Sequence, residues 1–199
     1  MKTFKQHILE KLKVSARNTT KHTLFPETKD ELKQMIKDEI SKNGNKCSLN
    51  HIDVSKITNM SELFYGSKFN GDISDWNVSK VESTARMFQE SDFTGDISEW
   101  NVSNVKYMSE MFERSKFNGD ISNWNVSKVE SMRGMFRWSI FNKDISKWNV
   151  SNVKNMYAMF AYSKFNQDIS NWDVSSLKTM GNMFGVSPLQ NNPPKWYKK

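Results

Sequence analysis

The pattern of apolar positions repeats every 24 residues along most of the chain. An early copy, which starts at Leu49, lacks tryptophan but keeps the other apolar positions. A fixed period of this length is typical of stacked-repeat proteins, in which each unit buries its apolar face against its neighbours. The pattern predicts six units over residues 49–192, and the last five are marked by Trp76, Trp100, Trp124, Trp148 and Trp172.

Each unit begins with a pattern that predicts a short strand. Ile73, Trp76, Val78 and Val81 follow the LxxLxL spacing of a leucine-rich repeat, with tryptophan in one leucine position. Trp76 and Val78 alternate with polar residues such as Asn77, so we expect the apolar side chains to point inward and the polar ones outward. The repeated outward asparagine predicts a hydrogen-bonded ladder along the sheet.

The second part of each unit predicts a short helix. After Val81 the next apolar positions fall at steps of 3, 3 and 1 residues, which suits a turn or two of helix packed on the strand. The expected fold is therefore an α/β solenoid of leucine-rich-repeat type, with six 24-residue strand-plus-short-helix coils and an N-terminal capping helix.

The segments on either side of the repeats predict caps. Thr28 and Glu31 form a capping-box sequence, and Leu32 and Ile36 begin an apolar stripe at helical spacing. We expect four parts: a basic amphipathic arm and linker (1–24), an N-terminal capping helix (25–48), the six-repeat solenoid (49–192) and a basic C-terminal tail or cap (193–199). Two capped ends favour a monomer.

The repeated motif [DN]IS-x-W-[ND]-VS-x-V-x-x-M-x-x-MF-x-x-S-x-F-N resembles the BspA-like leucine-rich-repeat family, in its mycoplasma-type form. Members of that family are chiefly bacterial surface proteins. The resemblance implies an extended surface that is used for protein contact or adhesion.

The first ten residues resemble a different family. Met1-Lys2-Thr3-Phe4 and the Ile8-Leu9-Glu10 site are similar to the capsid-targeting peptide of internal head proteins in T-even-like phages. That resemblance implies cleavage between Glu10 and Lys11, and it gives an alternative hypothesis of a packaged phage head protein.

Charge is concentrated at the two ends of the chain. The formal net charge is +7, of which residues 1–24 carry +5 and the last seven residues +3, so the body between them carries −1. We therefore expect no nucleic acid to bind along the solenoid.

No apolar run reaches the ~20 residues that a membrane helix needs. No secretory signal follows the basic start. We expect a cytoplasmic or virion-associated protein, unless it is exported by another route.

Little in the sequence predicts chemistry. The three histidines lack metal-ligand spacing, and the single Cys47 has no obvious base nearby. We expect no enzyme activity, no cofactor and no bound metal. A calcium- or glycan-binding surface adhesin is a further alternative, because one aspartate and one tryptophan recur in each unit, although calcium needs more oxygens than each unit supplies.

The copies differ from one another at positions that the core leaves free. Some of these are outward strand positions, and two are aromatic residues on the expected helix side, which are typical interface anchors. A macromolecular, most simply protein, partner is expected there. The candidate partner-binding residues are Asp75, Asn77, Glu99, Asn101, Asn123, Asn125, Trp138, Lys147, Asn149, Tyr162 and Asn171.

Overall fold

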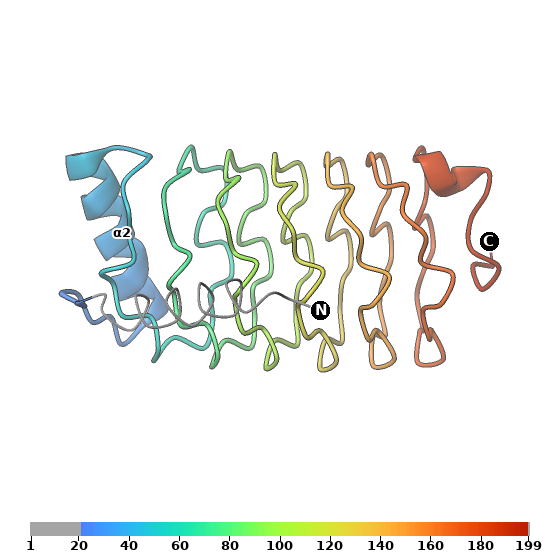
Figure 1. The fold of residues 1–199 in the computed structure, drawn as a ribbon, viewed down its shortest axis with the longest axis horizontal. Coiled ribbons are helices and arrows are strands. Elements are labelled where there is room, and N and C mark those ends of the chain that lie inside the picture. Colours follow the sequence, from blue (N-terminus) through green and yellow to red (C-terminus); the bar gives the residue numbers. More distant parts are fainter. Residues whose placement is uncertain (1–20, 199) are drawn as a thin grey trace, which may run out of the picture.

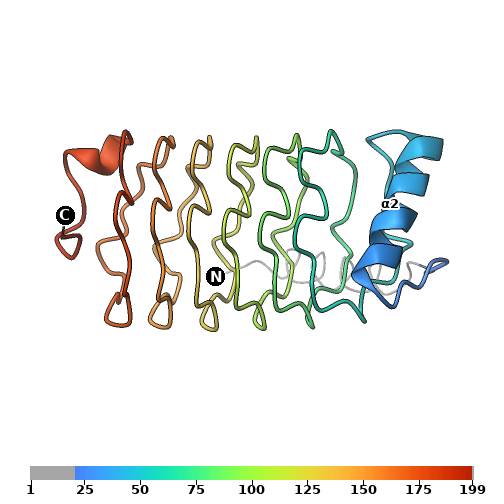
Figure 2. The ribbon, with the colours of Figure 1, turned by 180° about the vertical axis from the view of Figure 1, so that it is seen from behind.

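The computed structural model describes residues 21–198 of the chain. It shows a row of similar coils stacked along one axis, and corresponding residues of neighbouring coils are 24 positions apart (Figure 1). The α-helix α2 (Lys29–Asn43) lies at the first end of the row, and the 3₁₀ helix η1 (Pro188–Gln190) lies at the last. The view from behind shows the same order of coils (Figure 2). Neighbours in the sequence are therefore neighbours in space.

Helix α2 begins with a reciprocal cap. The Thr28 hydroxyl accepts a hydrogen bond from the Glu31 backbone N–H, and the Glu31 carboxylate accepts one from the Thr28 N–H, both 3.2 Å long. Leu32 and Ile36 are buried in the same apolar cluster as the first coils. The helix ends at Asn43, and the next residue, Gly44, has a φ of 81° that suits glycine. Neither α2 nor η1 is long and apolar enough to cross a lipid bilayer, and residues 21–198 contain no other helix.

The coils contain neither the strand nor the helix that the sequence predicts, so the expected α/β solenoid of leucine-rich-repeat type is wrong. Within residues 21–198 the only strand-like contacts are isolated parallel bridges, most of them between residues 24 positions apart, such as Ser83 with Tyr107. A different set of hydrogen bonds joins the coils.

The segment expected to be helical is interrupted by two left-handed residues in each coil. Glu62 has a φ of 61° and Gly66 a φ of 62°, and the matching positions of the later coils are left-handed as well. An α-helix needs right-handed backbone at every residue, so it cannot pass through these positions. The segment forms short turns instead, for example from the Tyr65 N–H to the Glu62 carbonyl at 3.2 Å.

Alternate backbone N–H groups of this segment bind the next coil. Met60, Glu62 and Phe64 donate to carbonyl oxygens 23 residues further along the chain, at 2.9–3.0 Å. The same pattern recurs at the following junctions between coils. This side of the stack is therefore held by a backbone ladder, although the left-handed residues prevent it from being a regular sheet.

The tryptophan side of each coil is joined in another way. Here the backbone N–H groups close turns inside the coil, as in the 3.2 Å bond from Trp76 to the Ile73 carbonyl. The indole Nε1–H of Trp76 donates to the Leu49 carbonyl of the preceding coil at 3.0 Å. Bonds of 3.0–3.2 Å over the same 27-residue separation are made by Trp100, Trp124, Trp148, Trp172 and Trp196.

Columns of aromatic rings fill the space between the two sides. Phe64 stacks on Phe88 with ring centroids 5.5 Å apart, and Trp76 stacks on Trp100 at 6.4 Å. Phe64 also lies 5.9 Å from Trp76, so the two sides of a coil meet in the core. The predicted inward direction of tryptophan and valine is confirmed, because Trp76 and Val78 are buried.

The period continues one copy beyond the expected six units. Trp196 is 24 residues after Trp172, stacks on it with centroids 6.4 Å apart, and donates to the Ile169 carbonyl at 3.0 Å. Tyr197 packs edge-on against Phe184. The last tryptophan therefore belongs to the repeat register, although its own coil is incomplete.

Candidate functional site

The left-handed residues form two columns along one side of the stack, which we call the left-handed edge. The first column holds Glu62 and the residues at 24-residue steps after it, up to Asn182. The second column holds Gly66 and its counterparts, up to Val186. Ten of these twelve positions carry a residue other than glycine, with φ between 52° and 61°. The edge therefore displays side chains from a backbone conformation that favours glycine.

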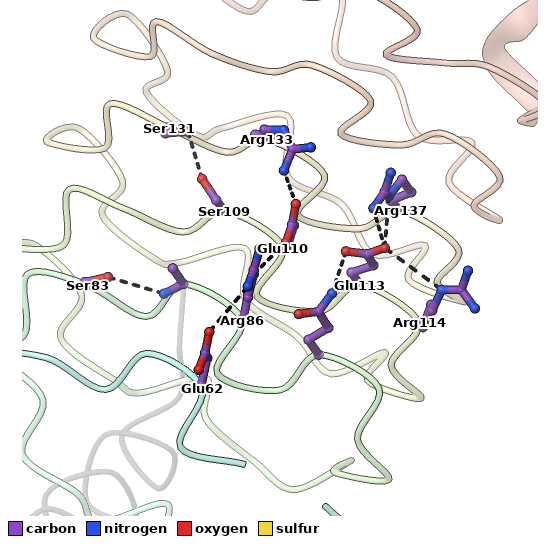
Figure 3. Close-up of polar contacts among 12 residues, drawn as sticks. Glu62, Ser83, Arg86, Ser109, Glu110, Glu113, Arg114, Ser131, Arg133 and Arg137 are labelled. Atoms are coloured by element: carbon purple, nitrogen blue, oxygen red, sulfur yellow. Dashed lines mark hydrogen bonds and ion pairs between the residues drawn. The ribbon is translucent and has the colours of Figure 1, made fainter. Parts of the chain in front are cut away.

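Glu110, in the first column, is a buried acid that sequence analysis missed. It is 4% exposed, and its carboxylate accepts a 2.8 Å hydrogen bond from Arg86 Nε and another from Arg133 (Figure 3). Gly134 follows at the same position of the next coil, and a Cβ there would lie 3.2 Å from Glu110 Cγ. The absence of a side chain at Gly134 therefore leaves space for the Glu110 side chain next to the two arginines.

Glu113 is a second buried acid, and it is 3% exposed. Its carboxylate accepts from Gln89 Nε2 at 2.8 Å and from Arg137 at 3.0 Å (Nε) and 2.6 Å (a terminal guanidinium nitrogen). The Arg114 guanidinium lies 4.0 Å away (Figure 3). Charge-assisted bonds of this kind hold the Arg137 side chain in one orientation.

These contacts give the middle of the edge a positive surface. Four guanidinium groups lie around the two buried carboxylates, and Arg86 also pairs with the exposed Glu62 at 3.4 Å, so the seven side chains carry a formal charge of +1. The carboxylate of Glu110 raises the pKa of Arg86, so that arginine stays charged. The acids are buried and the arginine side chains are 31–55% exposed. A molecule that approaches this surface meets guanidinium groups.

An aromatic stack adjoins the arginines. Trp138 and Tyr162, at successive positions of the second column, are parallel within 3° with ring centroids 4.0 Å apart. The Arg114 guanidinium lies over the other side of Trp138, 5.5 Å from the ring centroid. Trp138 and Tyr162 are 48% and 40% exposed, although each ring covers one face of the other.

A second arginine–aromatic pair lies beside the stack. The Arg133 guanidinium is 5.9 Å from the ring centroid of Tyr157, which is 42% exposed. Ala158 and Ala161 stand between Tyr157 and Tyr162 in the sequence, and both are buried. We call this surface the arginine–aromatic patch and define it by Arg114, Arg133, Arg137, Trp138, Tyr157 and Tyr162.

Of the predicted binding residues, Trp138 and Tyr162 are brought together in the patch. The other nine lie on the tryptophan side of the coils, one residue before or after a tryptophan. Among these, Lys147 and Asn123 line a shallow hollow together with Asp120 and Asp144. The structure therefore separates the predicted residues into two groups on opposite sides of the core.

The asparagines after each tryptophan do not form the expected ladder between coils. Asn77 Oδ1 accepts from the backbone N–H of Ser79, two residues on, at 3.2 Å. The same local turn is made by Asn101, Asn125 and Asn149. Asparagine bonds between coils occur at another corner, where Asn118 Oδ1 accepts from the Asn142 N–H at 2.9 Å. Each asparagine oxygen therefore finds its hydrogen-bond partner within its own turn, two residues further along the chain.

The aspartate repeated in each unit also bonds within its own turn. Asp144 Oδ1 accepts from the Ser146 N–H at 2.8 Å, and Asp120 bonds to Ser122 in the same way at 2.9 Å. These hydrogen bonds lower the pKa of both aspartates. Within residues 21–198, no group of three or more histidine, cysteine, aspartate or glutamate residues is placed to hold a metal ion.

The predicted processing site, Glu10 and Lys11, lies outside the described residues. Its cleavage stays a prediction.

The buried glutamates and their arginines left a weak signal in the sequence. Gly66 and Gly134 occur at the two column positions where other copies have bulky or charged residues, which indicates left-handed backbone at both. This signal locates the edge. It does not indicate which acids are buried, because burial depends on side chains of the neighbouring coils.

The chain matches a protein-family model, but it matches no curated protein. A family model matches residues 30–139 and again residues 93–196, which covers the capping helix and the repeats. No solved structure matches the chain either. The match confirms the mycoplasma-type repeat family and does not extend to the leucine-rich-repeat assignment. The chain belongs to the family described as Mycoplasma protein of unknown function, DUF285.

Proposed function

We propose that this chain is a non-enzymatic binding protein that contacts a protein partner through the arginine–aromatic patch. The stack of coils serves as a rigid support, and the side chains of the left-handed edge make the contact. The alternative surface is the tryptophan side, with residues such as Asn101 and Lys147.

The proposal rests mainly on one observation: most left-handed positions of the edge carry a residue with a side chain and not glycine. A residue other than glycine in this conformation costs about 1–2 kcal/mol. Ten positions of the left-handed edge have a residue other than glycine in this conformation, and only two have glycine. Backbone strain of this kind is concentrated at functional sites. The side chains of the edge are therefore expected to serve a purpose that glycine cannot serve.

The composition of the patch supports a protein partner. Tryptophan, tyrosine and arginine are the residues that dominate the energetics of protein interfaces. Here Trp138, Tyr162 and Arg114 lie in one stack and are 40–55% exposed. Their contacts with one another reduce the freedom that is lost when a partner binds.

The geometry of the rings disfavours two other classes of ligand. Sugars and nucleic-acid bases bind aromatic side chains by stacking on an open ring face. The facing sides of Trp138 and Tyr162 cover each other, and Arg114 covers the remaining face of Trp138. The exposed rims instead suit contacts with apolar and peptide groups.

The test is a binding measurement with the full chain and one double variant, Trp138→Ala/Tyr162→Ala. A partner captured by the wild-type chain from a lysate of the source cell is purified, and its affinity is measured by calorimetry. We expect the double variant to bind at least about tenfold more weakly, because buried aromatic anchors are worth 2 kcal/mol or more.

Two control variants locate the contact. Tyr65→Ala removes a tyrosine that is 53% exposed on the same side of the first coil, and it should leave the affinity unchanged. Asn101→Ala/Asn149→Ala tests the tryptophan side. If the asparagine variant loses binding and the aromatic variant retains it, the contact surface is the tryptophan side and the proposal is wrong.

A further inference from the structure

We propose that the segment recognised by the arginine–aromatic patch is acidic, with carboxylates that bind Arg114, Arg133 and Arg137 and apolar groups that lie against the ring rims. This inference rests on the proposed function, because it names the chemistry of the partner at the same surface.

The arginines of the patch are exposed, whereas the acids that they contact are buried. The carboxylates of Glu110 and Glu113 have side chains only 6% and 4% exposed, whereas Arg114 and Arg133 are 55% and 44% exposed. The acids are closed in by arginines, so they neutralise part of the charge without being available to a partner. The surface is therefore complementary to negative charge.

The arginines of the patch keep hydrogen-bond donors that the buried acids do not use. A guanidinium group has five N–H donors. Arg137 uses its Nε and one terminal nitrogen on Glu113, and Arg133 uses one terminal nitrogen on Glu110. Arg114 stands 4.0 Å from Glu113, beyond hydrogen-bond distance. Several N–H groups of these partly exposed guanidinium groups thus make no bond to the buried acids, and carboxylates are the protein groups that fit their planar, paired geometry.

Neighbouring side chains hold the arginines in place before a partner binds. Glu113 fixes Arg137 through two hydrogen bonds, and Trp138 and Tyr157 lie under the guanidinium groups of Arg114 and Arg133. Free arginine side chains lose rotamer entropy when they bind, whereas held ones lose less. The buried glutamates are thus positioning residues for the binding arginines.

Anionic nucleic acid would also be attracted by the arginines, but Tyr162 and Arg114 cover Trp138, so its bases cannot stack on that ring. A protein segment needs no open ring face, since its apolar side chains can lie against the ring rims. An acidic segment with apolar residues between the carboxylates satisfies both parts of the patch.

The experiment uses the full chain and fluorescent peptides of equal length. One peptide alternates glutamate with leucine, a second has glutamine and a third has lysine in place of glutamate, and a single-stranded oligonucleotide is the fourth probe. Binding is followed by fluorescence anisotropy at low and high salt. We expect the glutamate peptide to bind at least about tenfold more tightly than the glutamine peptide, and its affinity to fall as salt rises.

Two charge variants tie the effect to the patch. Arg114→Gln removes an arginine that makes no hydrogen bond to the buried acids, so the fold should be kept, and a melting curve verifies this. It should weaken binding of the glutamate peptide several-fold. Lys80→Gln removes the same charge from an exposed position on the tryptophan side and should have no effect.

The outcomes separate this inference from the proposed function. If the glutamate and glutamine peptides bind equally and Trp138→Ala/Tyr162→Ala abolishes both, the patch binds protein and the acidic specificity is wrong. If only the oligonucleotide binds, and it does so through the patch, both proposals are wrong. If the glutamate peptide fails to bind at a concentration of about 1 mM, a free energy near −4 kcal/mol, the acidic specificity is again overturned.

Discussion

The indole Nε1–H of Trp124 donates a 3.1 Å hydrogen bond to the carbonyl oxygen of Ile97 in the preceding coil. This side-chain bond does what a backbone ladder does in a parallel sheet, because it joins two coils in register. The same carbonyl also accepts the Trp100 backbone N–H at 3.2 Å inside its own coil, so the indole supplies a second bond, the one that reaches the next coil. Phenylalanine at this position would supply the ring without that donor.

Removal of one indole donor should destabilise the stack. Trp124→Phe keeps an aromatic ring in the column and removes the bond between the coils, while the Ile97 carbonyl keeps its bond from the Trp100 N–H. We expect the free energy of unfolding to fall by about 0.5–1.5 kcal/mol, as measured by urea denaturation. The matched control is Trp138→Phe at the exposed edge, where a change within about 0.5 kcal/mol is expected. Equal losses at both positions would show that the indole bond contributes nothing.

Glycine should stabilise the chain at a left-handed position that has no binding role. Val186 has a φ of 52° and is 60% exposed, and a β-branched residue is strained in this conformation. We expect Val186→Gly to raise the free energy of unfolding by about 0.5–1 kcal/mol. Val174→Gly is the control, at a position without positive φ, and it should lower stability. A loss of stability at Val186 would contradict the strain argument.

Glu113 and Arg137 should stabilise the fold jointly, through the hydrogen bonds between their side chains. Glu113→Ala leaves Arg137 and Gln89 without their shared acceptor, and we expect a loss of about 2–3 kcal/mol in a urea titration. Since Arg137 is 31% exposed, water solvates part of its guanidinium group in the variant, so the expected loss is smaller than the ~3–5 kcal/mol of a fully buried pair.

A double-mutant cycle separates this pair from its surroundings. Arg137→Ala added to Glu113→Ala should cost little more, so the two single losses should exceed the loss in the double variant. Strict additivity would mean that the two side chains do not stabilise each other.

Stability should fall in acid because of the aspartate turns. The hydrogen bonds from the backbone and side chain of Ser146 lower the pKa of Asp144 below its usual 3.8, and Ser122 does the same for the pKa of Asp120. A carboxylate whose folded pKa is lowered contributes stability above its unfolded pKa. That contribution is lost as the pH falls through the folded pKa. The affected pH window therefore lies at and below about pH 4.

The measurement is the urea midpoint near neutral pH and at about pH 3. Asp120→Asn/Asp144→Asn keeps an oxygen acceptor for the serine N–H groups but removes the titration, so its midpoint should change less with acid than that of the wild-type chain. Asp38→Asn, on helix α2, is the control that removes a carboxylate without an aspartate turn. An unchanged acid response in the double variant would refute this assignment.

Much of the arrangement follows from the 24-residue period alone. The period identifies which residues stack on one another, such as Phe64 on Phe88, and the alternation around Trp76 identifies the side chains that point inward. The capping-box residues Thr28 and Glu31 mark the start of α2. These features are local or strictly periodic, so the order of residues determines them.

The predicted strand and helix failed for one physical reason. Apolar spacing shows which side chains face the core, but it does not show which carbonyl group receives each backbone N–H. In this chain the Met60 N–H donates to the carbonyl of Ser83 in the next coil, and the tryptophan indole replaces a strand ladder on the other side. Left-handed residues such as Glu62 interrupt the expected helix in the segment that forms the ladder.

The sequence indicates the aromatic residues of the candidate site but not its buried acids. Trp138 and Tyr162 were found because they depart from the repeat, and the structure stacks them 4.0 Å apart. The burial of Glu110 and Glu113 is not predicted from the sequence, because an acid in a variable position is usually exposed to solvent. The sequence by itself determined the period, the register and the inward face. The tertiary structure alone decided the path of the backbone and the burial of those two acids, because both depend on contacts between residues that are about one coil apart.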